Sequence, residues 1–144
     1  MGVGENEEPY QIPENIPQNV SEAELLYAVM HNKITSEYLA DLKEVSGLKD
    51  EILSGSLNMN IKTFRSYKMT PLPMKPHLQE HVFAMLSLYR HGIHVFGSYQ
   101  IFNEWLEKVN YFFDNDKPLN FLTTISGIRF IDNRLSAIEY GDNV

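Results

Sequence analysis

The 144-residue sequence contains no cysteine, and this absence excludes disulfide bonds and thiolate metal sites. Long apolar runs are also missing, because the hydrophobic residues are spread over segments too short to cross a membrane. The first residues lack a cationic stretch followed by an apolar core, so no secretory signal is expected. Together these absences predict a cytoplasmic protein without a membrane span.

Positive charge is scarce as well, since 12 Lys and Arg stand against 19 Asp and Glu and give a net charge of −7. The charges are unevenly distributed. Residues 1–32 hold six glutamates and no Lys or Arg, whereas residues 60–94 hold five cations and one glutamate. Salt screens charges beyond about 10 Å, so a basic patch on an acidic protein can still contact phosphates. The net charge therefore does not exclude a nucleic-acid partner.

Signals for helices recur from residue 20 onward. Ser21 and Glu24 form a capping box, which predicts a first helix that buries Leu25, Leu26 and Val29. The predicted helices are 22–32, about 35–47, a short helix from 50, 61–68, 77–97, a helix from 98, and a last helix that ends near Gly141. The sequence therefore predicts an all-α fold.

Composition divides the chain into three predicted segments. Residues 1–19 carry four glutamates and three prolines, and they hold too few large apolar groups to offset the entropy of ordering. Residues 69–76 contain three prolines, which remove amide donors and fix φ, so we expect a linker there. The predicted division is a disordered acidic arm at 1–19, a helix-turn-helix module at 20–70 and a second helical module at 71–144.

The two short helices at 50–68 have the pattern of a helix-turn-helix. They are joined by a turn at 58–60, and Asn60 can cap the second helix. This second helix exposes hydroxyl and cationic side chains that can reach base edges and phosphates in a major groove. The candidate DNA-binding residues are Lys62, Thr63, Arg65, Ser66 and Lys68. The pattern leaves open a second interpretation, in which this is a solvated helix of a small bundle.

The segment from His77 to His81 matches the H-x-x-E-H motif of zinc proteases. Two histidines four residues apart share a helix face and can bind one ion. The pattern lacks a third ligand, so we interpret His77, His81, His91 and His94 as surface histidines near a basic patch. No nucleophile arrangement stands out, and we expect no catalytic residue, no metal and no cofactor. A metal-dependent hydrolase that uses His77 and His81 is the weakest hypothesis.

The last predicted helix ends close to the end of the sequence. Thr124 and Ser126 are residues that cap helix starts, and Gly141 stands where a left-handed residue is expected after the last turn. Gly127 is interpreted as a site of close packing. The apolar residues recur at steps of three and four, at Ile128, Ile131, Leu135 and Ile138. A buried helix of this kind leaves a short surface tail that can reach a partner.

Several separately placed features between Phe102 and Gly141 resemble one protein family. They are Trp105-Leu106, Pro118-Leu119, Phe121-Leu122, Thr124-x-x-Gly127, Ile131, Leu135 and Ile138-Glu139-Tyr140-Gly141. In this order they resemble the C-terminal toxin-binding domain of Xre/MbcA/ParS-type antitoxins, and the resemblance extends more weakly back to about residue 35. Where the family has a glycine-rich turn, this chain has residues 113–116, in which Asn115 can adopt positive φ.

The resemblance implies an antitoxin of a type II toxin–antitoxin system, with an Xre-like helix-turn-helix module followed by a small helical toxin-binding domain. Such an antitoxin binds a RES-domain toxin that degrades NAD, covers the toxin's active site with its C-terminal helix and tail, and represses its own operon by binding operator DNA. We expect a homodimer and no enzymatic activity. Toxin binding falls on Arg129, Arg134, Ile138, Glu139, Tyr140, Gly141 and Asp142. The alternative is a helix-turn-helix transcriptional regulator without a toxin partner.

Overall fold

The structure, a computed structural model, describes residues 12–19 and 21–144. Within these residues it contains seven α-helices, two short 3-10 helices and no strand, which confirms the all-α fold. None of the described helices is long and apolar enough to span a bilayer. The elements are α1 (Glu22–Met30), α2 (Ser36–Ser46), α3 (Asp50–Ser56), α4 (Ile61–Met69), α5 (Pro76–Phe96), α6 (Tyr99–Leu106), η1 (Tyr111–Phe113), η2 (Pro118–Phe121) and α7 (Ile125–Glu139).

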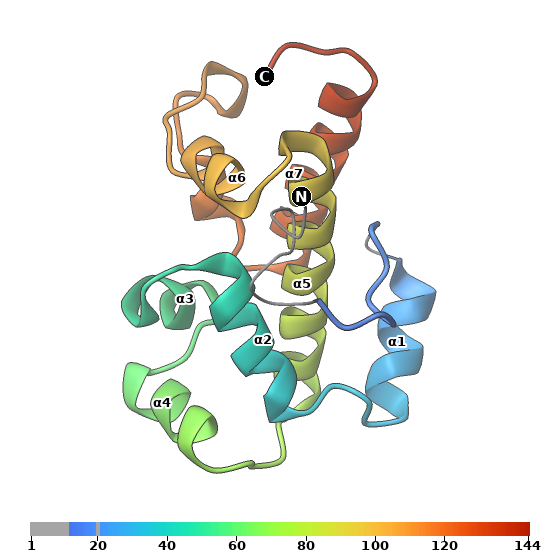
Figure 1. The fold of residues 1–144 in the computed structure, drawn as a ribbon, viewed down its shortest axis with the longest axis vertical. Coiled ribbons are helices and arrows are strands. Elements are labelled where there is room, and N and C mark those ends of the chain that lie inside the picture. Colours follow the sequence, from blue (N-terminus) through green and yellow to red (C-terminus); the bar gives the residue numbers. More distant parts are fainter. Residues whose placement is uncertain (1–11, 20) are drawn as a thin grey trace, which may run out of the picture.

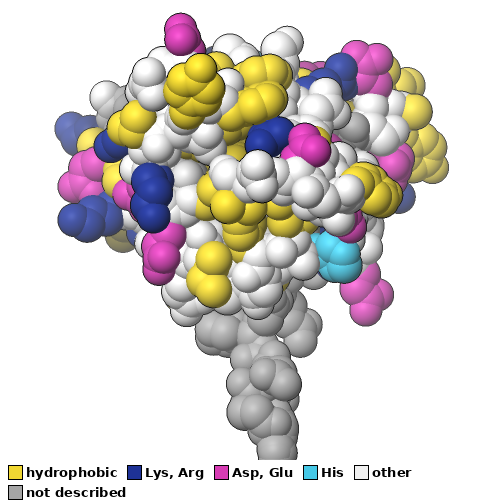
Figure 2. All heavy atoms as spheres, turned by 90° about the horizontal axis from the view of Figure 1, so that it is seen from above, with side chains coloured by type: hydrophobic (Ala, Val, Ile, Leu, Met, Phe, Trp, Pro, Cys, Tyr) yellow, Lys and Arg dark blue, Asp and Glu magenta, His cyan; other side chains and the backbone are white. Residues whose placement is uncertain are grey.

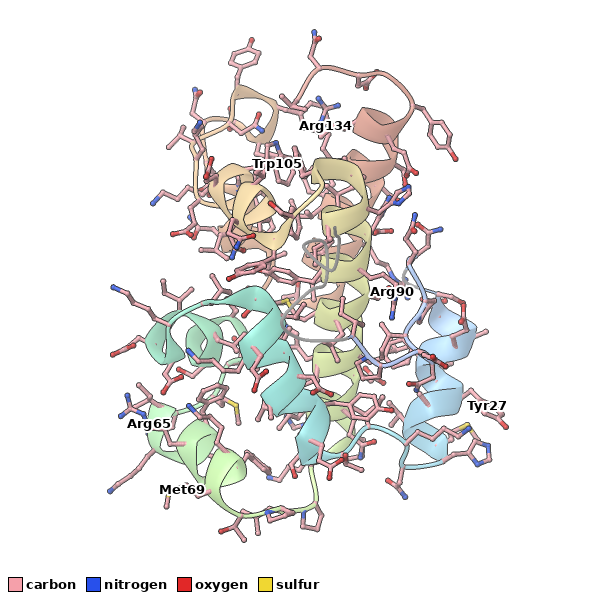
Figure 3. The ribbon with its side chains drawn as sticks, in the orientation of Figure 1. Tyr27, Arg65, Met69, Arg90, Trp105 and Arg134 are labelled. Carbon is pink, nitrogen blue, oxygen red and sulfur yellow. The ribbon has the colours of Figure 1, made fainter. Side chains whose placement is uncertain are left out.

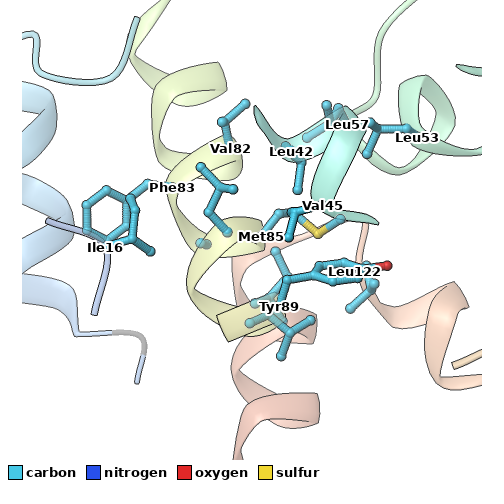
Figure 4. Close-up of a cluster of buried hydrophobic side chains, with 14 of the residues drawn as sticks. Ile16, Leu42, Val45, Leu53, Leu57, Val82, Phe83, Met85, Tyr89 and Leu122 are labelled. Carbon is cyan, nitrogen blue, oxygen red and sulfur yellow. The ribbon is translucent and has the colours of Figure 1, made fainter. Parts of the chain in front are cut away.

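The longest helix, α5, runs through the centre of the molecule (Figure 1). It packs against α1, α2, α6 and α7, and thirteen of its 21 residues are buried. One cluster of buried hydrophobic side chains extends from Ile16 to Leu135, with Val82, Met85 and Tyr89 of α5 in its middle (Figure 4). The boundary between residues 70 and 71 stays a prediction, and α5 contacts helices on both sides of it.

Local capping chemistry accounts for several of the helix ends. The side chains of Ser21, Asn60 and Ser98 accept backbone N–H bonds and so begin α1, α4 and α6. At their other ends, α2 and α5 stop at Gly47 and Gly97, which both have positive φ. These signals lie within a few residues of each helix end, which is why the sequence predicts them well.

The start of α7 is fixed by a cap and by a close contact. Thr124 Oγ1 accepts the N–H of Gly127 at 2.9 Å, so Thr124 is the cap and Ser126 lies inside the helix. A Cβ added to Gly127 would stand 1.7 Å from the carbonyl oxygen of Phe121. The helix and η2 therefore approach so closely that only glycine fits, which confirms the interpretation of Gly127 as a close-packing site.

The structure differs from the predicted arm at residues 12–19. Ile16 is 2% exposed and lies beside α5 in the core (Figure 4). Arg90 of α5 donates hydrogen bonds of 3.1 and 2.9 Å to two carbonyl oxygens of this stretch. One large apolar side chain and the main-chain carbonyls are enough to place it on α5, which its composition did not reveal. Residues 1–11 of the predicted arm lie outside the described residues.

The first helix buries a narrower face than its sequence predicts. Leu25 is buried as expected, but Leu26 is 54% exposed and the prediction for it was wrong. Ala28 is buried instead. It follows Leu25 by three positions and therefore lies on the same side of α1, and this side rests on α5.

Candidate functional site

The end of α7 turns sharply and sends the tail back toward α6 (Figure 1). The N–H of Gly141 donates to the carbonyl of Ile138, and the N–H of Asp142 donates to the carbonyl of Ala137, both at 3.0 Å. These two bonds are the Schellman arrangement, which requires positive φ at the residue after the cap. Gly141 has a φ of 112°, as its sequence position predicts. Its part in the site is therefore to make the turn.

Two side chains hold the tail in place, and Figure 3 shows both at this end of the molecule. Arg134 donates to the Asp142 carboxylate at 3.1 Å and to the carbonyl oxygen of Asn143. The indole N–H of Trp105 donates to the main-chain oxygen of Val144 at 3.2 Å. The Arg134 side chain is 9% exposed, so it acts inside the molecule as a support for the tail.

A groove of about 380 Å³ lies between the tail, α6 and η1. Figure 2 looks onto this end and shows hydrophobic side chains gathered on it. Tyr111 is 89% exposed and Tyr140 is 87% exposed. We call this end of the molecule the C-terminal face. Its exposed apolar side chains are Ile101, Val109, Tyr111 and Val144, which all line the groove, together with Phe112 and Tyr140 outside the groove.

The aromatic residues of η1 divide between this face and the core. Phe113 is buried, with its ring centre 5.5 Å from that of Phe130 on α7. Phe112 lies under the Arg134 guanidinium, 3.9 Å from ring centre to Cζ, in a cation–π contact. Tyr111, in contrast, faces solvent.

A buried histidine fixes the last turn of α7 to α5. His91 has no exposed surface; its Nδ1 lies 2.7 Å from Asp132 and its Nε2 lies 2.9 Å from Glu139. Burial disfavours the charged imidazole, but the two carboxylates outweigh burial and raise the pKa of His91. His94 lies 3.1 Å from the second oxygen of Glu139. The hydrogen bond from His91 lowers the pKa of Glu139, so this carboxylate is charged and occupied within the molecule.

The interpretation of the histidines as surface residues was wrong for His81 and His91, which are both buried. His81 Nε2 lies 2.8 Å from the carbonyl oxygen of Leu122, and burial lowers its pKa. His81 therefore joins α5 to the segment before α7, whereas His77 is exposed. The described residues contain no group of three metal-ligating side chains placed to hold an ion.

The remaining predicted toxin-binding residues differ in exposure. Ile138 is half-buried at the end of the apolar stripe, whose other members, Ile128, Ile131 and Leu135, are fully buried. Arg129 lies 2.8 Å from Glu22 of α1, in an exposed ion pair that contributes little stability. Tyr140 is thus the large side chain of the set that is presented to solvent.

All five predicted DNA-binding residues are exposed on α4, and Arg65 lies at the opposite end of the molecule from Arg134 (Figure 3). Phe64, between them in the sequence, has no exposed surface and anchors the helix. The turn before α4 is held by Asn58, which has a φ of 58° and donates to the carbonyl of Thr123 at 2.7 Å. The two helices and the turn lie where the sequence predicts them, and DNA contact stays a prediction.

The contacts that support the C-terminal face were not predicted from the sequence. His91 and His94 share a helix face by their spacing, which was a usable signal. Their partner Glu139 is 48 residues away from His91, however, and no local pattern joins the two. Trp105 was named only as one of the residues that carry the family resemblance. Its hydrogen bond to the tail joins residues 39 positions apart, so no local pattern predicts it.

Comparison with known families agrees with this geometry. A family model described as the antitoxin Xre/MbcA/ParS C-terminal toxin-binding domain matches residues 91–141. The match begins at His91 and ends at Gly141, so it includes α6, η1, η2 and all of α7. The resemblance drawn from the sequence is confirmed over this range. None of the curated proteins matches the chain.

Proposed function

From the premise that this chain carries the toxin-binding domain of an Xre/MbcA/ParS-type antitoxin, and has a toxin as its partner, we propose that it neutralises a RES-type toxin that degrades NAD. In this proposal the C-terminal face covers the toxin's active site and keeps NAD out. The RES assignment rests on the family resemblance. The pair would act in the cytoplasm, where the NAD that such a toxin attacks is held.

The observation that carries this proposal is that Tyr140 is exposed while the residues on both sides of it are held by contacts within the molecule. Its neighbour Glu139 is fixed by two histidines, and the tail beyond it is fixed by Arg134 and Trp105. A backbone that is already held in place loses less entropy on binding, and tyrosine is among the residues that dominate interface energies. The fold therefore presents Tyr140 in the manner of an interface anchor.

Replacement of Tyr140 with alanine tests the proposal. The toxin encoded beside this gene is purified, and its NAD hydrolysis is titrated with antitoxin. We expect Tyr140→Ala to raise the concentration needed for half-inhibition by about 30-fold or more, the cost of a lost anchor. Tyr27→Ala is the matched control, because Tyr27 is an exposed tyrosine on α1, and it should inhibit like the unaltered protein. Equal inhibition by the two variants would contradict the role of Tyr140.

A second activity, repression of the antitoxin's own operon, is favoured by the exposed side chains of α4. Lys62 and Thr63 stand at the start of this helix and are exposed. In helix-turn-helix proteins, the first residues of the second helix contact base edges, and dimers bind two half-sites one helical turn apart. We therefore propose that a homodimer of this chain binds a palindromic operator through α4. The alternative of a regulator without a toxin partner would use the same helix.

A further inference from the structure

Asp50, the first residue of α3, stands at the centre of a group of cations from α2 and α4. Its carboxylate lies 3.1 Å from Lys43 Nζ, 3.2 Å from Lys68 Nζ and 3.2 Å from Arg65 Nε. Hydrogen bonds from Lys43, and then from Arg65 and Lys68, lower the pKa of Asp50 to about 2. The carboxylate is therefore charged at neutral pH and acts as a fixed acceptor for the three cations.

The three cations differ in how many of their hydrogen-bond donors are still available to a ligand. Lys43 also donates to the carbonyl oxygen of Leu48 at 2.5 Å, and Lys68 donates to both oxygens of Asp50 and lies over the Phe64 ring. Arg65 reaches Asp50 through Nε. Its Nη1 and Nη2 donate to no residue in the described part of the chain, and its side chain is 54% exposed. The outer edge of the Arg65 guanidinium is thus ordered and open to solvent.

We propose that Arg65 reads a guanine in the major groove and that Asp50 is the positioning residue that orients Arg65 for this contact. Two parallel N–H groups of a guanidinium match the O6 and N7 acceptors of guanine, which is the commonest specific contact between proteins and DNA. Arginine has a long, flexible stem, so a carboxylate that binds Nε reduces the freedom lost on binding. This inference rests on the proposed operator binding and adds the base that α4 recognises.

The test begins with the full-length protein and a pool of duplexes that contains a randomised segment. Duplexes enriched by the unaltered protein are then measured by fluorescence anisotropy, with each guanine replaced in turn. We expect one guanine to be preferred over the other bases by on the order of tenfold to a hundredfold. Arg65→Lys keeps the charge but not the paired N–H groups, and it should lose this preference while retaining affinity for other duplexes.

Asp50→Asn should lower the same preference toward the level of Arg65→Lys. Glu51→Gln is the matched control, because it removes one negative charge from the next, exposed residue of α3 and should keep the preference. Thermal melts followed by circular dichroism verify the fold of each variant. If Asp50→Asn proves less stable, Arg65→Lys still tests whether Arg65 recognises the guanine.

Three results would overturn the inference. If Asp50→Asn keeps the guanine preference as Glu51→Gln does, the positioning role of Asp50 is wrong. If Arg65→Lys weakens binding to every duplex equally, Arg65 contacts phosphate and reads no base. If the unaltered protein enriches no duplex, the proposed operator binding itself is wrong. The first two results, in contrast, would leave the proposed operator binding standing.

Discussion

Gly127 restricts what the first turn of α7 can contain. A β-carbon there would stand 1.7 Å from a backbone oxygen, which cannot move aside as a flexible side chain can. We expect Gly127→Ala to lower the free energy of unfolding by about 1–3 kcal/mol, the usual cost of overpacking. Urea unfolding monitored by circular dichroism measures this change.

The control for this variant is Gly55→Ala, in the last turn of α3. Apart from the neighbouring backbone of α3 itself, no atom of the described residues lies within 4 Å of a β-carbon at Gly55, so alanine there should be neutral or stabilise the protein by up to about 1 kcal/mol. A cost at Gly127 no greater than at Gly55 would show that η2 and α7 pack less closely than described.

For single residues, the sequence predicts a structural role correctly when that role depends on neighbours in the chain. Thr124 and Gly141 act within four residues of themselves, as a cap and a turn. Arg134 and Glu139 were predicted to contact the toxin, and the fold uses both internally. A charged side chain near a predicted interface looks the same in sequence whether its partner lies within the molecule or outside it.

The junction between α5 and α7 depends on pH through His91. The pKa of His91 is raised in the folded protein, so its contribution to stability is complete below its unfolded pKa, about 6.5, and is lost as pH rises through the folded pKa. Glu139 has a lowered pKa and contributes above its usual value of 4.5. The His91–Glu139 bond therefore contributes most between pH 4.5 and about pH 6.5, where Glu139 is ionised and His91 is protonated.

Replacement of His91 with glutamine should therefore cost more stability at pH 5.5 than at pH 9. Urea unfolding of both proteins at the two pH values gives the difference. His81 has a lowered pKa and changes stability in the opposite direction, but it is present in both proteins and cancels in the comparison. A cost that is the same at both pH values would mean that folding does not raise the pKa of His91.

The helices themselves were largely predictable, because caps and apolar spacing are local signals. Their packing partners were not. Leu26 lies on the apolar side of α1 in sequence but points away from α5, and Ile16 belongs to a stretch whose composition predicts disorder. Both outcomes depend on where α5 lies, and α5 is more than 45 residues away in the chain.

In the whole molecule, α5 separates two exposed surfaces. The C-terminal face lies at one end, and α4 with Arg65 lies at the other (Figure 3). The two surfaces share no residue, so a toxin could be bound at one end while the other end remains open to DNA. Variants at Tyr140 and at Arg65 are therefore expected to act independently of each other.

The C-terminal face is the basis of the proposed neutralisation, and truncation tests it directly. Removal of residues 140–144 deletes Tyr140 and the tail but leaves Glu139, and with it the bond to His91. The measurement is NAD hydrolysis by the cognate toxin, titrated with full-length or truncated antitoxin. We predict that the truncated protein stays folded, by circular dichroism, and no longer stops NAD hydrolysis at equimolar concentration. Full inhibition by the folded, truncated protein would contradict the account.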